Sequence, residues 1–225
     1  MLAASFGCHV YAFELQPLCI SIAHTAARKN HFTHLIEVFH QPVGATHGET
    51  ALINYPKDQY CDGGFTLLEG VYEKNTHTKN APLEVKKKFL TVSLGDLIPR
   101  NTTIDLIKLD VEGYEPEVLL GAEPLFKSRQ VQGAVVEISN HLPAQWARPN
   151  NAGATAAVPA DPLAHPFFDV YQRILGYGYE METLNCNTSP KAKGRIFRAN
   201  SFDEFKKYAL KPARQKCFDV FFRKI

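Results

Sequence analysis

Short apolar runs alternate along the chain with segments of helical periodicity, and this alternation limits the fold more than any other feature of the sequence. The runs are rich in Val, Ile and Phe, as in strands that are buried in a sheet. Strands that alternate with helices are typical of a parallel sheet covered by helices. The predicted strands are residues 9–14, 35–44, 104–110, 132–139, 179–185 and 217–224. The predicted helices are residues 17–30, 114–126, 166–175 and one that begins at the capping-box pair Ser201 and Glu204.

The composition is that of a globular protein with one core. The 225 residues are 45% hydrophobic and 21% charged, which predicts a single domain over residues 1–225. The formal net charge is +2 and the basic residues are scattered, so no strong field would attract nucleic acid or an anionic membrane. No segment has the apolar length of a membrane span, and the first residues make a poor signal peptide. The sequence is silent on oligomeric state.

The cysteines favour a reducing compartment. They are odd in number, far apart and free of C-x-x-C spacing, which argues against a disulfide framework and against a zinc site. We therefore expect a cytoplasmic protein. The five residues are Cys8, Cys19, Cys61, Cys186 and Cys217.

Two segments interrupt the alternation and are predicted to be inserted loops. Residues 72–88 are polar and basic, whereas residues 142–166 are rich in Pro, Ala and Asn without an apolar period. The second segment follows the carboxyl end of a predicted strand, where ligands bind in parallel sheets. Its two interpretations, a substrate lid and a disordered insertion, both stay open.

Three of the predicted strands end in acidic residues. The acids are Glu14, the pair Asp110 and Glu112, and Glu137. Because the carboxyl ends of parallel strands line the ligand crevice of an open sheet, these side chains are candidates for a functional site. Nucleotide-binding folds also hold ribose hydroxyls with an acid that follows a strand of the sheet, which makes Glu14 a candidate ribose ligand.

The acids also have structural interpretations. Glu115 and Glu117 fall in the first turn of a predicted helix, where an acid favours the positive end by ~0.3 to 1 kcal/mol. Asp110 and Glu112 can instead accept hydrogen bonds from the amides of their own loop. Glu14 can be an ordinary surface acid. These alternatives stay open beside the functional ones.

The segment "IDLIKLDVEGYEPEVLLGA", residues 104–122, resembles the signature segment of the FkbM family of methyltransferases, which use S-adenosyl-L-methionine (SAM). In that family a strand ending K-x-D-x-E-G-x-E runs into a helix and a following G-A. "VYAFELQP" is similar to the second-strand segment of the family, and "VGATHGETAL", "LTVSLGDLI", "VVEIS" and "DVFFRK" follow in the family's order. The resemblance covers roughly residues 7–140 and the last strand.

This resemblance implies a Rossmann-like class I methyltransferase fold: an α/β domain with a mostly parallel sheet, helices on both faces and an antiparallel C-terminal strand. It also implies transfer of a methyl group to a hydroxyl oxygen, here of an unidentified small-molecule or glycan acceptor. By position, Glu14 would hold the SAM ribose, and Asp110 and Glu112 would lie beside the cofactor and the acceptor.

The residue types suit that chemistry. The sulfonium methyl group is already activated, so an enzyme must align the acceptor oxygen and remove its proton. Asp110 is the first choice for the base or the acceptor-orienting group, and Glu112 is the second. Glu137 and His141 are alternatives, although a lone histidine is more often a loop residue. No third ligand is evident from spacing, so no metal is predicted.

The chain departs from the family at its start. A glycine-rich loop is expected about twenty residues before the ribose acid, and counting back from Glu14 leads past residue 1. "MLAASFG" is similar to the last turns of the first helix, so the first strand and its loop are expected to be missing. We therefore expect unpaired strand edges, low stability and SAM binding no tighter than about millimolar. A degenerate non-catalytic domain and a nicotinamide-dependent oxidoreductase are the alternative functions.

Overall fold

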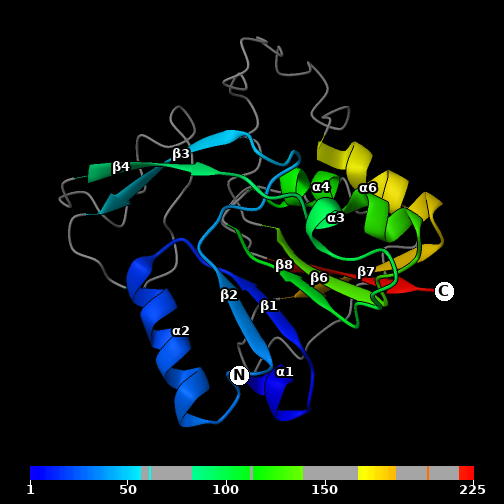
Figure 1. Ribbon diagram of the computed structural model, residues 1–225. Helices are drawn as coiled ribbons and strands as arrows, with labels where there is room; N and C mark the ends of the chain where they lie inside the picture. The colour runs from blue at the N-terminus through cyan, green and yellow to red at the C-terminus, as the bar shows by residue number, and fades with distance from the viewer. Residues whose placement is uncertain (57–60, 62–82, 112–113, 139–166, 186–201, 203–217) are drawn as a thin grey trace. The chain divides into compact units, whose positions relative to one another are not determined.

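The computed structural model describes residues 1–56, 61, 83–111, 114–138, 167–185, 202 and 218–225 (Figure 1). These residues divide into two compact units, Met1–Val92 and Ser93–Ile225. None of the helices in the described ranges has the length and hydrophobicity needed to span a bilayer. The predicted helix that begins at Ser201 lies outside the described residues apart from Phe202. The expectation of a single domain stays a prediction.

The first unit contains a parallel strand pair joined by a helix, as predicted. Strand β1 pairs with β2 from Val10↔Ile36 to Phe13↔Phe39, and the rings of Phe13 and Phe39 stack 5.0 Å apart. The connecting helix α2 begins at a proline, whose fixed φ suits the first helical turn. A helical turn at the start of the chain is also confirmed. The elements of this unit are α1 (Leu2–Ser5), β1 (Val10–Phe13), α2 (Pro17–Lys29), β2 (Ile36–Phe39), β3 (Thr50–Pro56) and β4 (Leu83–Leu90).

The antiparallel pair β3–β4 corrects one loop prediction. Residues 72–88 were expected to form a loop, but β4 begins at Leu83 and pairs with β3 from Leu83 to Leu90, with one register shift near its start. The run of three lysines hid this strand, because lysine has a low strand propensity. Lys87 and Lys88 are exposed, and exposed lysines are tolerated where a strand lies at a sheet edge. Residues 72–82 lie outside the described part of the chain.

A disulfide corrects the expectation that the cysteines do not pair. Cys19, in α2, is bonded to Cys61 with a Cα–Cα distance of 5.0 Å, whereas Cys8 is a free thiol. Pairing depends on how close the fold brings two Cα atoms, and spacing in the sequence does not report this. Disulfides persist mainly in oxidising compartments. This bond therefore does not support the reducing, cytoplasmic compartment that the cysteine pattern favoured.

The disulfide should stabilise the chain measurably. It joins residues 42 positions apart. Closing a loop of that size lowers the conformational entropy of the unfolded chain, which raises the free energy of unfolding by ~2 to 4 kcal/mol. We expect Cys61→Ser to lower the free energy of unfolding by about this amount in urea denaturation, and a reducing agent to have the same effect on the wild type. Cys8→Ser is the control and should change little. Equal stabilities of the wild type and Cys61→Ser would contradict the bond.

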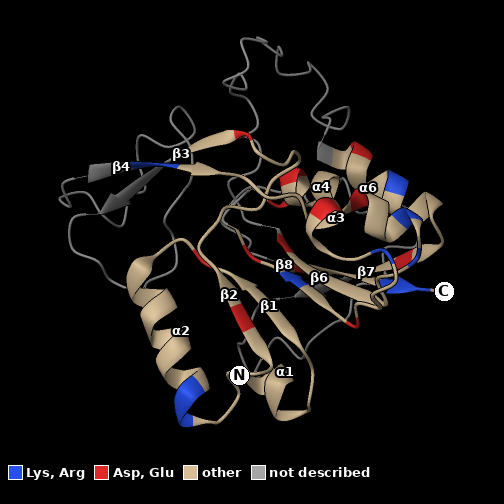
Figure 2. Ribbon diagram, viewed as in Figure 1, with Lys and Arg blue, Asp and Glu red and all other residues tan. Residues whose placement is uncertain are grey.

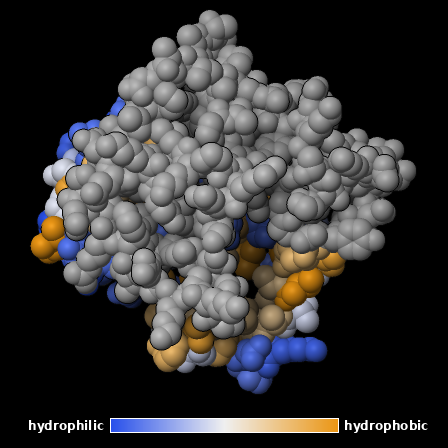
Figure 3. All heavy atoms as spheres, turned by 180° about the vertical axis from the view of Figure 1, so that it is seen from behind, coloured by the Kyte–Doolittle hydropathy of each residue, from blue (hydrophilic) through white to orange (hydrophobic). Residues whose placement is uncertain are grey.

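Several large apolar side chains of the first unit reach the surface. Leu2 and Phe6 are 74% and 79% exposed, and Ile22 in α2 is 53% exposed. Figure 3 shows hydrophobic atoms of described residues, in orange, on one face of the molecule. Among the described strands, β1 pairs only with β2, and β5 (Ile107–Leu109) pairs only with β6 (Gly133–Ile138). The expectation of unpaired edges stays a prediction.

The second unit is built around a four-stranded sheet of order β5-β6-β8-β7. Strands β5 and β6 are parallel, whereas β8 is antiparallel to both β6 and β7. The antiparallel C-terminal strand is therefore confirmed, but a mostly parallel sheet is not confirmed in the described residues. The remaining elements of this unit are α3 (Leu94–Leu97), α4 (Glu115–Lys127), α6 (Phe167–Gly176), β7 (Tyr179–Asn185) and β8 (Phe218–Lys224).

Helices α4 and α6 cover the same face of this sheet. The ring of Phe222, in β8, lies 6.4 Å from the ring of Phe126 in α4 and 5.6 Å from that of Tyr171 in α6. All three side chains are completely buried, as is Val136 in the neighbouring strand. Since strand residues alternate between the two faces of a sheet, the residues between these buried ones lie on the opposite face.

Candidate functional site

The structure describes three of the five predicted site residues. Asp110 follows β5 directly and Glu137 lies near the end of β6, both in the second unit. Glu14 follows β1 in the first unit. Glu112 and the alternative His141 lie outside the described residues, and their roles stay predictions.

Asp110 and Glu137 meet at the carboxyl ends of two parallel strands. In the register of these strands Leu109 lies beside Val136. The next residues, Asp110 and Glu137, therefore lie side by side at the carboxyl ends of the two strands. The two side chains are hydrogen-bonded to each other. The edge that the sequence predicted to line a ligand crevice thus brings two of the candidate carboxyl groups together.

Glu137 changes its charge near neutral pH. Burial is the largest cause that raises its pKa, from 4.5 to about 7, followed by the hydrogen bond to Asp110 and the negative charges of Asp110 and Asp219. The positive charge of Lys108 lowers this pKa but does not outweigh the other effects. The protonated Glu137 carboxyl donates to the Asp110 carboxylate. Ionising Glu137 would place a second negative charge beside that of Asp110, and this repulsion favours the protonated form of Glu137.

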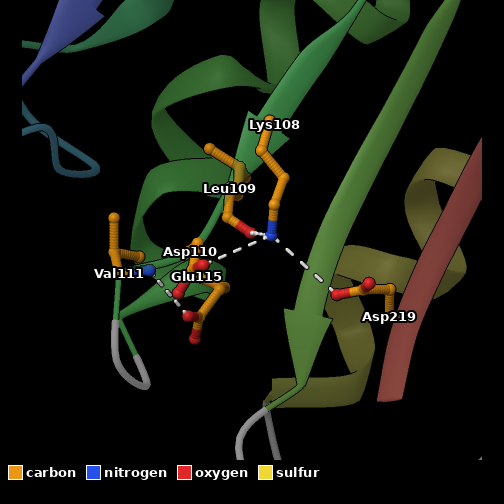
Figure 4. A network of polar contacts seen from close by, with 6 residues as sticks. All are labelled: Lys108, Leu109, Asp110, Val111, Glu115 and Asp219. Atoms are coloured by element: carbon orange, nitrogen blue, oxygen red, sulfur yellow. Dashed lines mark hydrogen bonds and ion pairs between the residues drawn. The ribbon is translucent and has the colours of Figure 1, made fainter. Parts of the chain in front are cut away.

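Two residues that the sequence analysis did not assign complete this cluster (Figure 4). The Nζ atom of Lys108 lies 3.5 Å from Oδ2 of Asp110 and 3.9 Å from Oδ1 of Asp219. It also donates to the carbonyl oxygen of Leu109 at 3.4 Å. The lysine stands in the quoted signature segment, but Asp219 gave no local signal, because only the pairing of β8 with β6 places it beside Glu137.

The cluster lies on the sheet face opposite α4 and α6. In β8 the neighbours Val220 and Phe222 are fully buried under the helices, so Asp219 points to the other side. Lys108 likewise alternates with the buried residues Ile107 and Leu109 in β5. Figure 2 shows acidic and basic segments close together on this sheet. On this face Lys108, Asp110 and Asp219 stay partly exposed to solvent, whereas Glu137 is partly buried.

Glu115 has a larger structural role than the first-turn charge predicted for it. It does lie in the first turn of α4, but its side chain is only 1% exposed. Its Oε1 atom accepts a hydrogen bond of 3.0 Å from the backbone N–H of Val111. Burial raises the pKa of Tyr171 well above its usual value, and the charge of Glu115 raises it further. Glu115 thus ties the loop that follows Asp110 to the buried start of α4.

Glu14 has a fixed carboxylate after β1. Its Oε1 atom accepts hydrogen bonds from the N–H groups of Leu15 at 2.7 Å and Gln16 at 2.8 Å. These bonds fit the interpretation of an acid that holds its own loop. In the part of the chain that the structure describes, Oε2 makes no hydrogen bond, so it can accept one from a ligand hydroxyl. The two interpretations of Glu14 are therefore compatible.

The acids do not form a metal site within the described residues, where no group of three or more His, Cys, Asp or Glu side chains is arranged to hold a metal ion. In the cluster around Glu137 the nearby positive charge is the ammonium group of Lys108. The positive charge of Lys108 therefore balances part of the negative charge of the acids in this cluster.

The raised pKa of Glu137 makes stability depend on pH. A carboxyl whose folded-state pKa is raised contributes stability that is full below its unfolded value of 4.5 and is lost as the pH rises through about 7. Glu137→Gln imitates the protonated form, so its melting temperature should match the wild type at pH 4.5 and exceed it at pH 8. The exposed Glu37→Gln is the control. A difference that stays constant with pH would contradict the raised pKa.

Comparison with known protein families matches residues 3–181 to the methyltransferase FkbM domain. The matched range covers most of the chain and includes Glu14, Lys108, Asp110 and Glu137, whereas Asp219 lies beyond it. No curated protein and no solved structure matches the chain. The family match agrees with the resemblance carried by the segment that ends β5 and begins α4. This protein therefore belongs to the FkbM methyltransferase family.

Proposed function

We propose that this protein transfers a methyl group from SAM to a hydroxyl oxygen of a small-molecule or glycan acceptor, and that the Asp110–Glu137 pair accepts the hydroxyl proton. The observation that carries the proposal is the hydrogen-bonded carboxyl pair at the ends of two parallel strands, with the pKa of Glu137 near 7. Membership of a methyltransferase family supports the transfer of a methyl group.

The pair supplies what the chemistry needs from the protein. SAM, when bound, supplies a methyl group that is already activated by its positive sulfur. The acceptor hydroxyl must then lose its proton as the oxygen attacks, and a base works best when its pKa is near the operating pH. Glu137 meets this condition, with its pKa of about 7. When Glu137 is ionised beside Asp110, the two negative charges repel, and taking up one proton relieves that repulsion.

The two carboxyl groups have different roles in this proposal. Asp110 was the first choice for the base or the acceptor-orienting group, and its hydrogen bond to Glu137 and its ion pair with Lys108 favour the orienting role. Glu137 then accepts the proton, and Asp110 accepts the hydrogen bond of the newly protonated Glu137. Glu112, which lies two residues after Asp110, stays a candidate for holding the acceptor.

Glu14 fits the proposed cofactor in its own unit. Two backbone amides fix its Oε1 atom, and the second oxygen can accept a hydrogen bond from a ribose hydroxyl. A carboxylate in this place after a strand is the usual ribose ligand of nucleotide-binding folds.

Transfer of a labelled methyl group tests the function. We would incubate the protein with SAM labelled in its methyl group and with matched acceptors that carry a hydroxyl, an amine or a thiol on the same skeletons. Label recovered as a methyl ether supports the proposal. Label found only on nitrogen or sulfur would refute the choice of oxygen, and a SAM-independent reaction would refute the cofactor.

Glu14→Ala should weaken SAM binding. A hydrogen bond to a charged acceptor is worth ~1.5 to 3 kcal/mol, so in a form of the protein that binds SAM the dissociation constant should rise about ten- to a hundredfold. Isothermal titration calorimetry measures this directly. Glu37→Ala, at an exposed position of β2, is the control. Unchanged SAM affinity in Glu14→Ala would remove this residue from the cofactor site.

A further inference from the structure

The sheet of the second unit places a lysine and a third acid at the proposed proton acceptor. Asp219 in β8 lies directly across from Glu137 in β6, and Lys108 lies in β5. We propose that Lys108 and Asp219 are positioning residues: Lys108 binds Asp110 and Asp219 together and thereby holds the Asp110 carboxylate against Glu137. This inference rests on the proposed function of the Asp110–Glu137 pair.

Lys108 reaches over the strand that carries Glu137. Strand β6 lies between β5 and β8 in the sheet, yet the Lys108 ammonium is within 4 Å of acids on both sides, at 3.5 Å from Asp110 and 3.9 Å from Asp219. Figure 4 shows the lysine pointing from its own strand toward both carboxylates. The three strands are thus connected by one side chain at the level of the Asp110–Glu137 pair.

This bridge contributes little to the stability of the fold. The side chains of Lys108, Asp110 and Asp219 are 50%, 49% and 28% exposed, and ion pairs that water can reach are weak because solvent screens them. The main effect of the bridge is therefore on the groups next to it. The bridge limits where the Asp110 carboxylate can lie and adds a positive charge near Glu137.

The two residues act on Glu137 in opposite directions. The charge of Lys108 lowers the pKa of Glu137, whereas the charge of Asp219 raises it, as does that of Asp110. These are the described charged groups from the neighbouring strands that act on Glu137. Removing Lys108 or Asp219 should consequently move the pKa of Glu137 in opposite senses. Damage to the fold would not produce opposite shifts from two neighbouring substitutions.

The test is a carboxyl carbon NMR titration of Glu137 in the 225-residue chain. We expect the midpoint to rise in Lys108→Met and to fall in Asp219→Asn, relative to the wild type. Lys108→Arg keeps the positive charge and should keep the midpoint close to that of the wild type. Lys127→Met and Asp169→Asn remove exposed charges from α4 and α6 and are the matched controls, with no expected shift.

The pH profile of methyl transfer gives the second readout. The acidic limb of kcat/KM should move to higher pH in Lys108→Met and to lower pH in Asp219→Asn. At pH 7 the turnover of Lys108→Met should fall about tenfold, a part of the full contribution of a general base. Lys108→Arg should recover most of this loss.

The outcomes separate the inference from the proposed function. Unchanged Glu137 midpoints in both variants, or midpoints that move in the same direction, would overturn the positioning roles. Opposite midpoint shifts support those roles even if no acceptor is methylated. Opposite midpoint shifts combined with full methyl transfer by Glu137→Gln would support the positioning roles and refute the proton-acceptor function of the pair.

Discussion

Asp110→Asn and Glu137→Gln should each lower the turnover of methyl transfer by about 10²- to 10⁴-fold, with little loss of SAM affinity. Each substitution removes one of the two carboxyl groups that meet at the ends of β5 and β6. Neither substitution changes the shape of the side chain much, so the loss reports on chemistry and not on packing. Single-turnover kinetics with labelled SAM measure it, and calorimetry measures the affinity.

The double variant sharpens this prediction. If the two carboxyl groups act as a unit, Asp110→Asn combined with Glu137→Gln should be little worse than the more damaging single variant. Asp169→Asn, at an exposed position of α6, is the control and should keep full activity. Near-normal turnover in both single variants would remove the pair from the reaction.

Phe222→Ala should cost ~3 to 5 kcal/mol of unfolding free energy, as other deletions of buried aromatic side chains do. The Phe222 side chain is fully buried, and its ring contacts the rings of Phe126 and Tyr171, which come from two different helices. The substitution would leave a cavity where β8 meets both helices. Urea denaturation followed by circular dichroism measures the loss.

Phe6→Ala is the control for this prediction. Phe6 is 79% exposed, so its removal should change the unfolding free energy by less than about 0.5 kcal/mol. A loss below about 1 kcal/mol in Phe222→Ala would mean that the core between β8 and the helices can collapse around the gap, and that the packing is looser than described.

The elements that local patterns specify were predictable from the sequence. Helix α2 begins at Pro17, and α4 begins one residue after the predicted start at Tyr114. Strand β4 was not predicted, because its lysines contradict the strand pattern and only pairing with β3 stabilises it. The bond between Cys19 and Cys61 was missed for a related reason, since it depends on the folded path of the chain.

The candidate site could be predicted only in part. Acids at strand ends pointed to Asp110 and Glu137, because parallel strands bring their carboxyl ends to one edge of a sheet. The same reasoning could not find Asp219, which stands near the start of an antiparallel strand and reaches that edge from the opposite direction. The interaction of Lys108 with two acids likewise depends on β8 lying beside β6.

The place of β8 in the sheet determines when this unit can fold during synthesis. The strand lies between β6 and β7, although both are translated before it. Synthesis adds ~5 to 20 residues per second, so the edge of β6 that pairs with β8 lacks this partner for several seconds. Unpaired strand edges are prone to aggregation and are bound by chaperones. The four-stranded sheet and the contact of Lys108 with Asp219 are complete only once residues 218–224 have been made. A premature stop codon before residue 218 would therefore remove one strand and also the partner of two others.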